Sequence, residues 1–349
     1  MSRRLLAAAT AGMLAAIAAG GQSSSGAAQA QSVADFYAHT GVTLIVGSGA
    51  GGGFDAYARV LARHYGHHLP GNPSVVVKNM PGATGLVAMN SLYNAAPRDG
   101  STILASFNTV PMSALYGDPN AKFDPRDFGW IGSIGKQTGT CLTWHDTPVK
   151  TIEDARSQEV VVGATGYGST PVTYPKLLNA TLDTKFKIVP GYSTPGLRLA
   201  VERGEIQGLC GIAWETLMST VANWIIDSKV NFLVQLGLTE SPHLRGVPLA
   251  IDLILNPDNR LVFELLGIAQ EFGRPFLAPP GVPAERLAAL RIAFEATMAD
   301  KDYRSDAARA NQFVDPLAAQ EIDALIARAY AAPKDIVARA AVYGAAAEN

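Results

Sequence analysis

The feature that most constrains the fold is the stretch of residues 42–69, which has the pattern of a strand, a loop and a helix. Residues 42–46 are mostly apolar and predict a buried strand. Five of the seven residues in 47–53 are glycine, so this loop's backbone can approach a ligand closely. Apolar residues then recur at three- and four-residue steps and predict one helix face: Phe54, Tyr57, Ala58, Leu61 and Tyr65. Because a helix start offers unpaired N–H groups and a favourable dipole, the segment predicts an anion cradle.

The same pattern returns about 115 residues later. Residues 160–162 predict a strand, residues 163–171 a second glycine-containing loop, and the residues after them a helix. Further strands are expected at residues 74–78, 102–106, 186–189 and 232–238. Because these strands alternate with helical segments, the sequence predicts an α/β protein with mainly parallel sheets.

The N-terminus predicts export from the cytoplasm. Arg3 and Arg4 precede an apolar run over residues 5–19, and a small-residue site follows with cleavage expected after Ala30. The run is shorter than the roughly 20 residues that a membrane span requires. We therefore interpret residues 1–30 as a signal peptide.

Charge and length limit the class of the mature chain. Removing residues 1–30 takes away two arginines and leaves 26 Lys and Arg against 30 Asp and Glu. This balance argues against nucleic acid and anionic membranes as partners. Because the remaining 319 residues exceed one typical core, two lobes are expected. We predict lobe 1 at residues 31–136, lobe 2 at 137–238, and the rest of lobe 1 at 239–349, with C-terminal helices that clasp the lobes.

Two motifs point to chemistry that their context does not support. Gly47, Gly49 and Gly52 have dinucleotide-fingerprint spacing, but the next strand ends in Lys78 and Asn79 rather than in an acid for a ribose hydroxyl. His64, His67 and His68 have a helical spacing that suits a metal, but the Glu of a metalloprotease motif is absent. We therefore predict neither NAD nor another cofactor, and no metal.

The serines and cysteines each leave alternatives open. No Gly-x-Ser-x-Gly elbow occurs, so Ser48 and Ser169 are expected in turns, in helix caps or against a bound carboxylate rather than as hydrolase nucleophiles. Cys141 and Cys210 are compatible with one disulfide in an oxidising compartment, and equally with two buried free thiols.

Several motifs follow one another in order along the chain. Gly51, Gly52 and Asp55 form Gly-Gly-x-x-Asp, residues 79–85 read Asn-x-Pro-Gly-Ala-x-Gly, residues 166–169 read Gly-x-Gly-Ser, and residues 276–283 are similar to Phe-Ala-Pro-x-Gly-x-Pro. In these motifs the chain resembles the substrate-binding proteins of tripartite tricarboxylate transporters, the Bug receptors, although the prolines that precede the first motif in the family are not kept. The resemblance covers essentially the whole mature chain.

The resemblance implies a periplasmic, two-lobed, type II-like Venus-flytrap fold. It implies a receptor, not an enzyme, that binds a small carboxylate-bearing organic acid and delivers it as a monomer to a two-subunit membrane permease. The alternative is a solute sensor that presents its ligand-bound form to a signalling partner. The residues expected to bind the ligand are Ser48, Gly51, Gly52, Gly53, Phe54, Ser106, Asn108, Gly166, Tyr167, Gly168, Ser169, Thr170 and Tyr192.

Three further residues carry expectations of their own. Asp55 is expected to order the start of its helix rather than to touch an anionic ligand, since like charges repel. Gly191 replaces a tyrosine of the family motif, which suggests a wider pocket and a bulkier acid. Trp214, as a lone aromatic residue, is expected in the core more readily than on a ligand wall.

Overall fold

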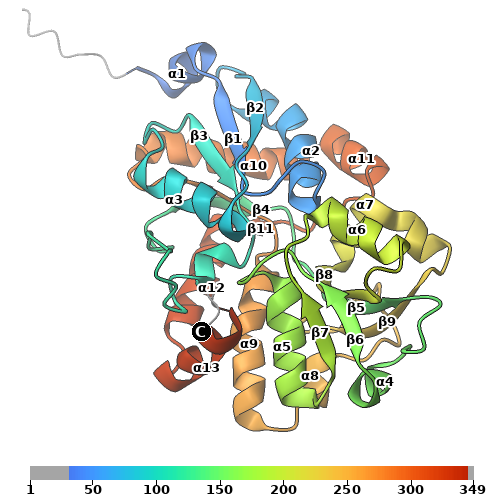
Figure 1. Ribbon diagram of the computed structural model, residues 1–349. Coiled ribbons are helices and arrows are strands. Elements are labelled where there is room, and N and C mark those ends of the chain that lie inside the picture. The colour runs from blue at the N-terminus through green and yellow to red at the C-terminus, as the bar shows by residue number, and fades with distance from the viewer. Residues whose placement is uncertain (1–30, 345–349) are drawn as a thin grey trace, which may run out of the picture. The chain divides into compact units, whose positions relative to one another are not determined.

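Two β-sheets organise residues 31–344, which are the residues that this computed structural model describes. The predicted signal peptide lies outside the described residues. The strand order is β11-β4-β10-β3-β1-β2 in the first sheet and β7-β6-β8-β5-β9 in the second. Figure 1 shows the first sheet in the upper lobe and the second sheet in the lower lobe. None of the helices between residues 31 and 344 has the length and apolar character needed to cross a membrane.

The first lobe is built around the predicted strand–loop–helix segment. Strand β1 (Val42–Val46) pairs in parallel with β2 (Val75–Asn79) and β3 (Thr102–Ala105). Helix α2 (Gly53–His68) buries the predicted face, including Tyr57, Leu61 and Tyr65. The sheet is completed by antiparallel strands from later segments: β4 (Gly129–Ser133), β10 (Pro275–Ala278) and β11 (Leu317–Ala318). Its other helical elements are α1 (Val33–His39), η1 (Ala83–Gly85), α3 (Leu86–Asn94), η2 (Val110–Met112), α10 (Ala284–Ala299) and α11 (Lys301–Arg309).

The second lobe repeats the arrangement. Strand β6 (Val160–Gly163) is parallel to β7 (Phe186–Val189) and to β8 (Gly208–Ala213). Strand β5 (Gly139–Trp144) is antiparallel to β8 and to β9 (Val230–Gln235). Its helices are α4 (Ile152–Ser157), α5 (Thr170–Leu182), α6 (Thr194–Glu202), α7 (Trp214–Ile226), α8 (Ala250–Leu253) and α9 (Pro257–Glu271).

The two-lobed α/β fold is confirmed, but both sheets are mixed rather than mainly parallel. The parallel pairs come from strand–helix–strand units, which the alternating pattern predicts. The antiparallel pairs involve β11 and the three strands β4, β5 and β10, which adjoin the segments where the chain passes between the lobes. Their neighbours in the sheet are distant in sequence, so local pattern does not reveal their direction.

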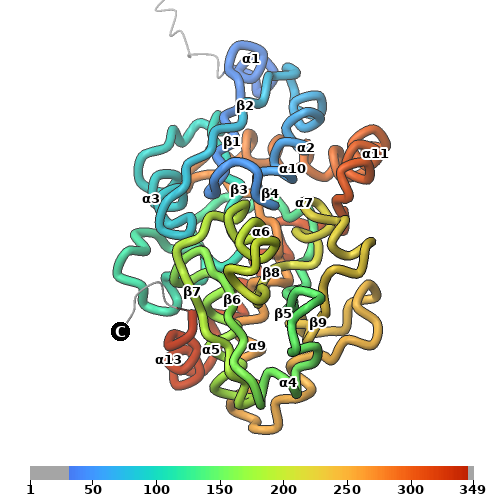
Figure 2. The backbone as a smooth tube through the Cα atoms, turned by 45° about the vertical axis from the view of Figure 1, so that its right-hand side comes forward, coloured from blue at the N-terminus to red at the C-terminus, as the bar shows by residue number. Residues whose placement is uncertain are grey.

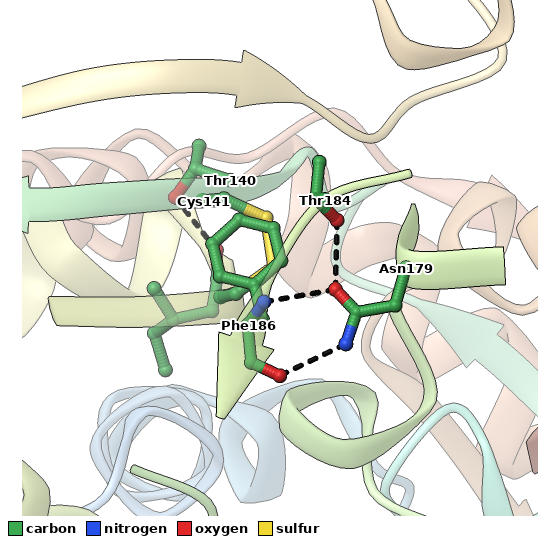
Figure 3. The surroundings of a disulfide bond; sticks show 7 residues. Thr140, Cys141, Asn179, Thr184 and Phe186 are labelled. Carbon is green, nitrogen blue, oxygen red and sulfur yellow. Dashed lines mark hydrogen bonds between the residues drawn. A yellow bond between two sulfur atoms is a disulfide. The ribbon is translucent and has the colours of Figure 1, made fainter. Parts of the chain in front are cut away.

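A disulfide links the two cysteines within the second lobe. Cys141 on β5 lies opposite Cys210 on β8, and the two sulfur atoms are bonded. Both residues are fully buried and share a core with Phe186. Figure 3 shows this region, where the Asn179 side chain bonds to Thr184 and to the backbone of Phe186. Of the two alternatives that the sequence leaves open, the structure has the disulfide.

Two chain segments cross between the lobes side by side. The first joins β4 to β5, and the second joins α9 to β10. The Ile134 N–H donates to the Arg274 carbonyl at 3.3 Å, and the Gln137 N–H donates to the Gln270 carbonyl at 2.9 Å. We call residues 134–138 and 272–274 the hinge segments.

The C-terminal helices contact both lobes. Helix α12 (Ala319–Tyr330) packs on β4 of the first sheet, and α13 (Lys334–Gly344) packs on α5 and α9. Figure 2 shows α13 beside these two helices in the lower lobe. Phe263 of α9 contacts Tyr174 of α5, so α9 packs on the second lobe although the predicted boundary at residue 238 assigns it to the first.

Candidate ligand-binding site

A cavity lies between the lobes at the carboxyl ends of β1, β3, β6, β7 and β8. This edge is where open α/β sheets commonly bind ligands. The cavity encloses about 640 Å³ of space, including the part open to solvent. Its walls come from Ser48, residues 52–54, Thr84 and residues 107–109 of the first lobe, from Thr165, residues 169–171, Thr194, Leu197, residues 211–213 and Thr216 of the second, and from hinge residue Gln137.

The lining consists of neutral hydrogen-bonding groups and apolar surface. Eight described lining residues carry a hydroxyl: Ser48, Thr84, Thr109, Thr165, Ser169, Thr170, Thr194 and Thr216. Asn108 and Gln137 add side-chain amides, and Phe54, Phe107, Leu197 and Ile212 add apolar walls. No ionisable side chain occurs among these described lining residues. Two buried lining atoms, Ser48 Oγ and Gln137 Nε2, have no hydrogen-bond partner.

The first glycine loop, residues 47–53, is fixed by Asp55. The Asp55 carboxylate accepts hydrogen bonds from the Gly51 N–H at 2.9 Å, from Asn79 Nδ2 at 2.8 Å and from Arg59 Nε at 3.0 Å. Asn79 Nδ2 also donates to the Ser48 carbonyl at 2.9 Å. Burial alone raises the pKa of Asp55, but these hydrogen bonds outweigh it and hold the pKa below its ordinary value. The carboxylate thus orders the loop and the helix start.

The second glycine loop, residues 163–171, uses neutral contacts. Ser169 is the N-cap residue of α5, and its hydroxyl donates to the Gly166 carbonyl within the same loop. The Tyr167 carbonyl accepts a hydrogen bond from Thr84 Oγ1 of the first lobe at 3.1 Å. The second loop is therefore bonded directly to the opposite lobe.

Two more contacts join the lobes beside the cavity. Arg198 of α6 donates through Nη2 to the Gly51 carbonyl at 3.2 Å. At Gly53, the first residue of α2, an added Cβ would lie 2.7 Å from Thr216 Oγ1 of α7. Glycine at this position permits the close approach of the two helices, which also contact one another elsewhere.

Most of the predicted site residues surround the cavity. Seven of them line it: Ser48, Gly52, Gly53, Phe54, Asn108, Ser169 and Thr170. Tyr192 lines an adjoining cavity that shares Ser48, Thr84 and Thr194 with the first. The Phe54 ring lies edge-on to Phe107, with ring centroids 4.6 Å apart. The binding roles of these residues stay a prediction.

Five predicted residues do not line either cavity: Gly51, Ser106, Gly166, Tyr167 and Gly168. Gly51 gives its N–H to Asp55, and the Ser106 hydroxyl donates to the neighbouring Phe107 carbonyl. Gly168 faces a separate small cavity beside Tyr116 and Tyr174. Gly191 also lines neither interlobe cavity, and its φ of +104° gives a backbone reason for glycine there.

Sequence reasoning missed several lining residues. These are Thr84, Phe107, Thr109, Gln137, Thr165, Pro171, Thr194, Leu197, Gly211, Ile212, Ala213 and Thr216. Thr84, Phe107, Thr109, Thr165, Pro171 and Thr194 lie shortly after predicted strands, so their position at the carboxyl end of a strand was an available signal. Gln137, Leu197, residues 211–213 and Thr216 have no comparable local signal, because tertiary packing brings them to the cavity.

The remaining singled-out residues have structural partners. His64 pairs with Asp306 at 3.0 Å and His68 with Asp300 at 2.8 Å, which joins α2 to the region of α11. Trp214 is buried and stacks on His243 with ring centroids 4.3 Å apart. Within residues 31–344, no group of three or more His, Cys, Asp or Glu residues is placed to hold a metal ion.

Comparison with known proteins agrees with the two-lobed fold. Residues 57–185 match the model of the tripartite tricarboxylate transporter family receptor. The solved structure of MatC from Rhodopseudomonas palustris with bound malate matches 86% of this chain and 99% of its own, with a TM-score of 0.65 and 21% identity. The predicted resemblance to the tripartite tricarboxylate transporter receptors is confirmed.

Two further matches extend this finding. A second R. palustris protein, solved with adipate, matches 87% of this chain and 97% of its own, with a TM-score of 0.67 and 19% identity. A UPF0065 protein of Agrobacterium vitis is 31% identical over 170 residues. That alignment spans 47% of each of the two chains, so it covers about half the length of this curated relative. At these identities the solved structures establish the shared fold.

Proposed function

We propose that this protein is a periplasmic receptor that binds a small carboxylate-bearing organic acid between its two lobes. In this proposal it performs no catalysis and uses no cofactor. It acts as a monomer that closes on the acid and delivers it to a two-subunit membrane permease of the tripartite tricarboxylate type. Closure would hide the acid and form the face that the permease recognises.

The observation that carries the proposal is the donor set of the cavity. Hydroxyl and amide groups surround a space that no described carboxylate lines, and Ser48 Oγ and Gln137 Nε2 are buried without partners. Buried donors without partners are costly, so a ligand that accepts hydrogen bonds is favoured there. A carboxylate accepts about four hydrogen bonds, and such bonds are stronger than neutral ones. The malate and adipate in the related structures support the same class of ligand.

A thermal-unfolding panel tests the proposal. The purified protein is heated with malate, adipate, succinate, citrate or benzoate, and with glucose, NAD and Zn²⁺ as controls. An acid at 100 times its Kd adds about 2.7 kcal/mol of stability, which raises the Tm of a chain of this size by about 4 °C or more. We expect this rise for one or a few acids, and loss of uptake of that acid when the gene is deleted. A rise with NAD or Zn²⁺ alone would contradict the proposal.

A further inference from the structure

Arg274 is a buried arginine behind the cavity wall, in contact with the lining residues Phe54 and Thr216. It ends the second hinge segment and is only 2% exposed. Its guanidinium carbon lies 3.8 Å from the centre of the Tyr57 ring and 5.2 Å from that of Phe54, both on α2. Arg274 Nη2 donates to Thr216 Oγ1 on α7 at 3.1 Å. One guanidinium therefore contacts the first lobe, the second lobe and the hinge.

The guanidinium retains an unused donor. Arg274 Nη1 is buried and has no hydrogen-bond partner. No Asp or Glu oxygen among residues 31–344 lies within 4.0 Å of its nitrogen atoms, so no ion pair balances the charge. Glu215 on α7 is buried and interacts with the Arg274 charge at longer range, but its carboxylate accepts the Thr138 N–H at 3.0 Å and makes no direct ion pair with Arg274. A buried charge without a direct ionic partner is unfavourable, and an incoming anion would compensate it further.

Thr216 connects this charge to the cavity. Its Oγ1 accepts the hydrogen bond from Arg274, which leaves its own hydroxyl hydrogen available to donate. Thr216 lines the cavity, and so does Gln137, whose Nε2 has no partner. The two lie close because the Trp214 N–H donates to the Thr138 carbonyl at 2.9 Å, which fixes the start of α7 to the hinge.

We propose that Arg274 and Thr216 form the subsite for the anionic group of the ligand, at the hinge end of the cavity. The ligand carboxylate accepts hydrogen bonds from Thr216 Oγ1–H and Gln137 Nε2 and faces the positive charge of Arg274. Arg274 acts mainly through Thr216, and it is thus a positioning residue that also supplies the charge. This inference rests on the proposed function and deepens it, because it assigns one end of the cavity to one carboxylate.

Substitution of Arg274 by methionine gives the main test. Methionine keeps an unbranched apolar chain like the stem of arginine, removes the charge and packs well on aromatic rings. We expect isothermal titration with the acids of the panel to give a Kd about 10- to 100-fold higher than wild type. The matched control is R291M on α10, where Arg291 Nε donates to the Trp130 carbonyl away from the cavity. Its Kd should stay within about twofold of wild type.

A charge-specific readout distinguishes an electrostatic role from a merely structural one. Wild type should prefer adipate over its neutral diamide, or malate over its diamide, and R274M should lose most of that preference. R274K, which keeps the charge but not the forked donors, should retain it in part. Removal of the hydroxyl alone in T216V should weaken binding about 5- to 30-fold and supplies a second test if R274M does not fold.

The outcomes separate the two proposals. Wild-type binding with R274M and T216V unchanged would overturn this inference and leave the proposed function in place. Equal loss in R274M and R291M would overturn it as well, because the effect would then not be local. Failure of wild type to bind any acid of the panel would overturn the proposed function and this inference together.

Discussion

The two glycine loops follow the same strand–loop–helix pattern and both border the cavity, yet different contacts hold them. The first loop, residues 47–53, depends mainly on its own lobe: Asp55 accepts the Gly51 N–H and Asn79 donates to the Ser48 carbonyl, while one bond, from Arg198 to the Gly51 carbonyl, comes from the second lobe. The second loop, residues 163–171, has a hydroxyl bond within itself and a bond from Thr84 of the opposite lobe.

This difference suggests two roles: the first loop is a preformed surface, and the second loop is completed only when the two lobes come together. All contacts of the Asp55 network lie within the first lobe, so they would persist if the lobes moved apart. The Thr84–Tyr167 bond and the Arg198–Gly51 bond both span the two lobes and would then break. We infer that the first loop presents ordered groups to an arriving ligand, while the second loop reaches its final arrangement around the bound one.

Replacement of Asp55 by alanine should give the largest loss of stability. The variant leaves the Gly51 N–H and Asn79 Nδ2 without their buried acceptor, and we expect unfolding to require about 2 kcal/mol less. The Arg59 side chain is 46% exposed, so the ion pair itself contributes little of this amount. Urea unfolding monitored by tryptophan fluorescence measures the change.

The control is E153A, which removes an exposed partner of Arg156 and should cost less than about 0.5 kcal/mol. The dependence of the unfolding free energy on pH, on the acid side, gives a second check. Because the folded-state pKa of Asp55 lies below its ordinary value near 4, its contribution is present above about pH 4 and is lost as the pH falls. D55A should therefore lose less stability on acidification than wild type. Equal effects of D55A and E153A would contradict an ordering role for Asp55.

Substitution of Gly53 by alanine should obstruct closure without weakening the first loop. The new Cβ would lie 2.7 Å from Thr216 Oγ1 in the present arrangement of the lobes, and relief of this overlap costs about 1–3 kcal/mol. We expect a Kd for the bound acid about tenfold higher, measured by isothermal titration. Alanine is also a better helix former than glycine, so thermal unfolding without ligand should not shift downward.

Gly49 supplies the matched control in the same loop. An added Cβ at Gly49 meets no atom within 4 Å, so G49A should bind within about twofold of wild type. Identical affinities of G53A and G49A would show that α2 and α7 need not approach this closely for binding.

The sequence predicts the two glycine loops because each is a local pattern. Residues 42–69 contain the strand, the loop and the amphipathic helix together, and the buried face of α2 contains the predicted Tyr57, Leu61 and Tyr65. The motif at residues 79–85 likewise marks the position of Asn79 and Thr84. The confirmed two-lobed fold follows from the repetition of this unit.

Other parts of the site depend on tertiary packing. Gln137, Thr216 and Arg274 lie far apart in the chain and meet only because the two hinge segments bond side by side. Gly51 has the sequence environment of a ligand donor, but Asp55 occupies its N–H. One signal for Arg274 was present: a charged residue stands directly before the apolar strand Pro275–Ala278, where a charge needs a partner or a function.

The smallest expected effect concerns the second loop. Replacement of Thr84 by valine preserves shape and removes the hydrogen bond to the Tyr167 carbonyl, so the Kd should rise about three- to tenfold. Since Thr84 also lines the cavity, a change in affinity alone does not show whether its hydroxyl holds the two lobes together, as a latch, or contacts the ligand directly. Small-angle X-ray scattering at saturating ligand does: a latch predicts a larger radius of gyration for T84V than for wild type. T220V, whose hydroxyl bonds only within α7, should match wild type. Weaker binding of T84V with an unchanged radius would assign Thr84 to the ligand and remove the second loop's dependence on closure.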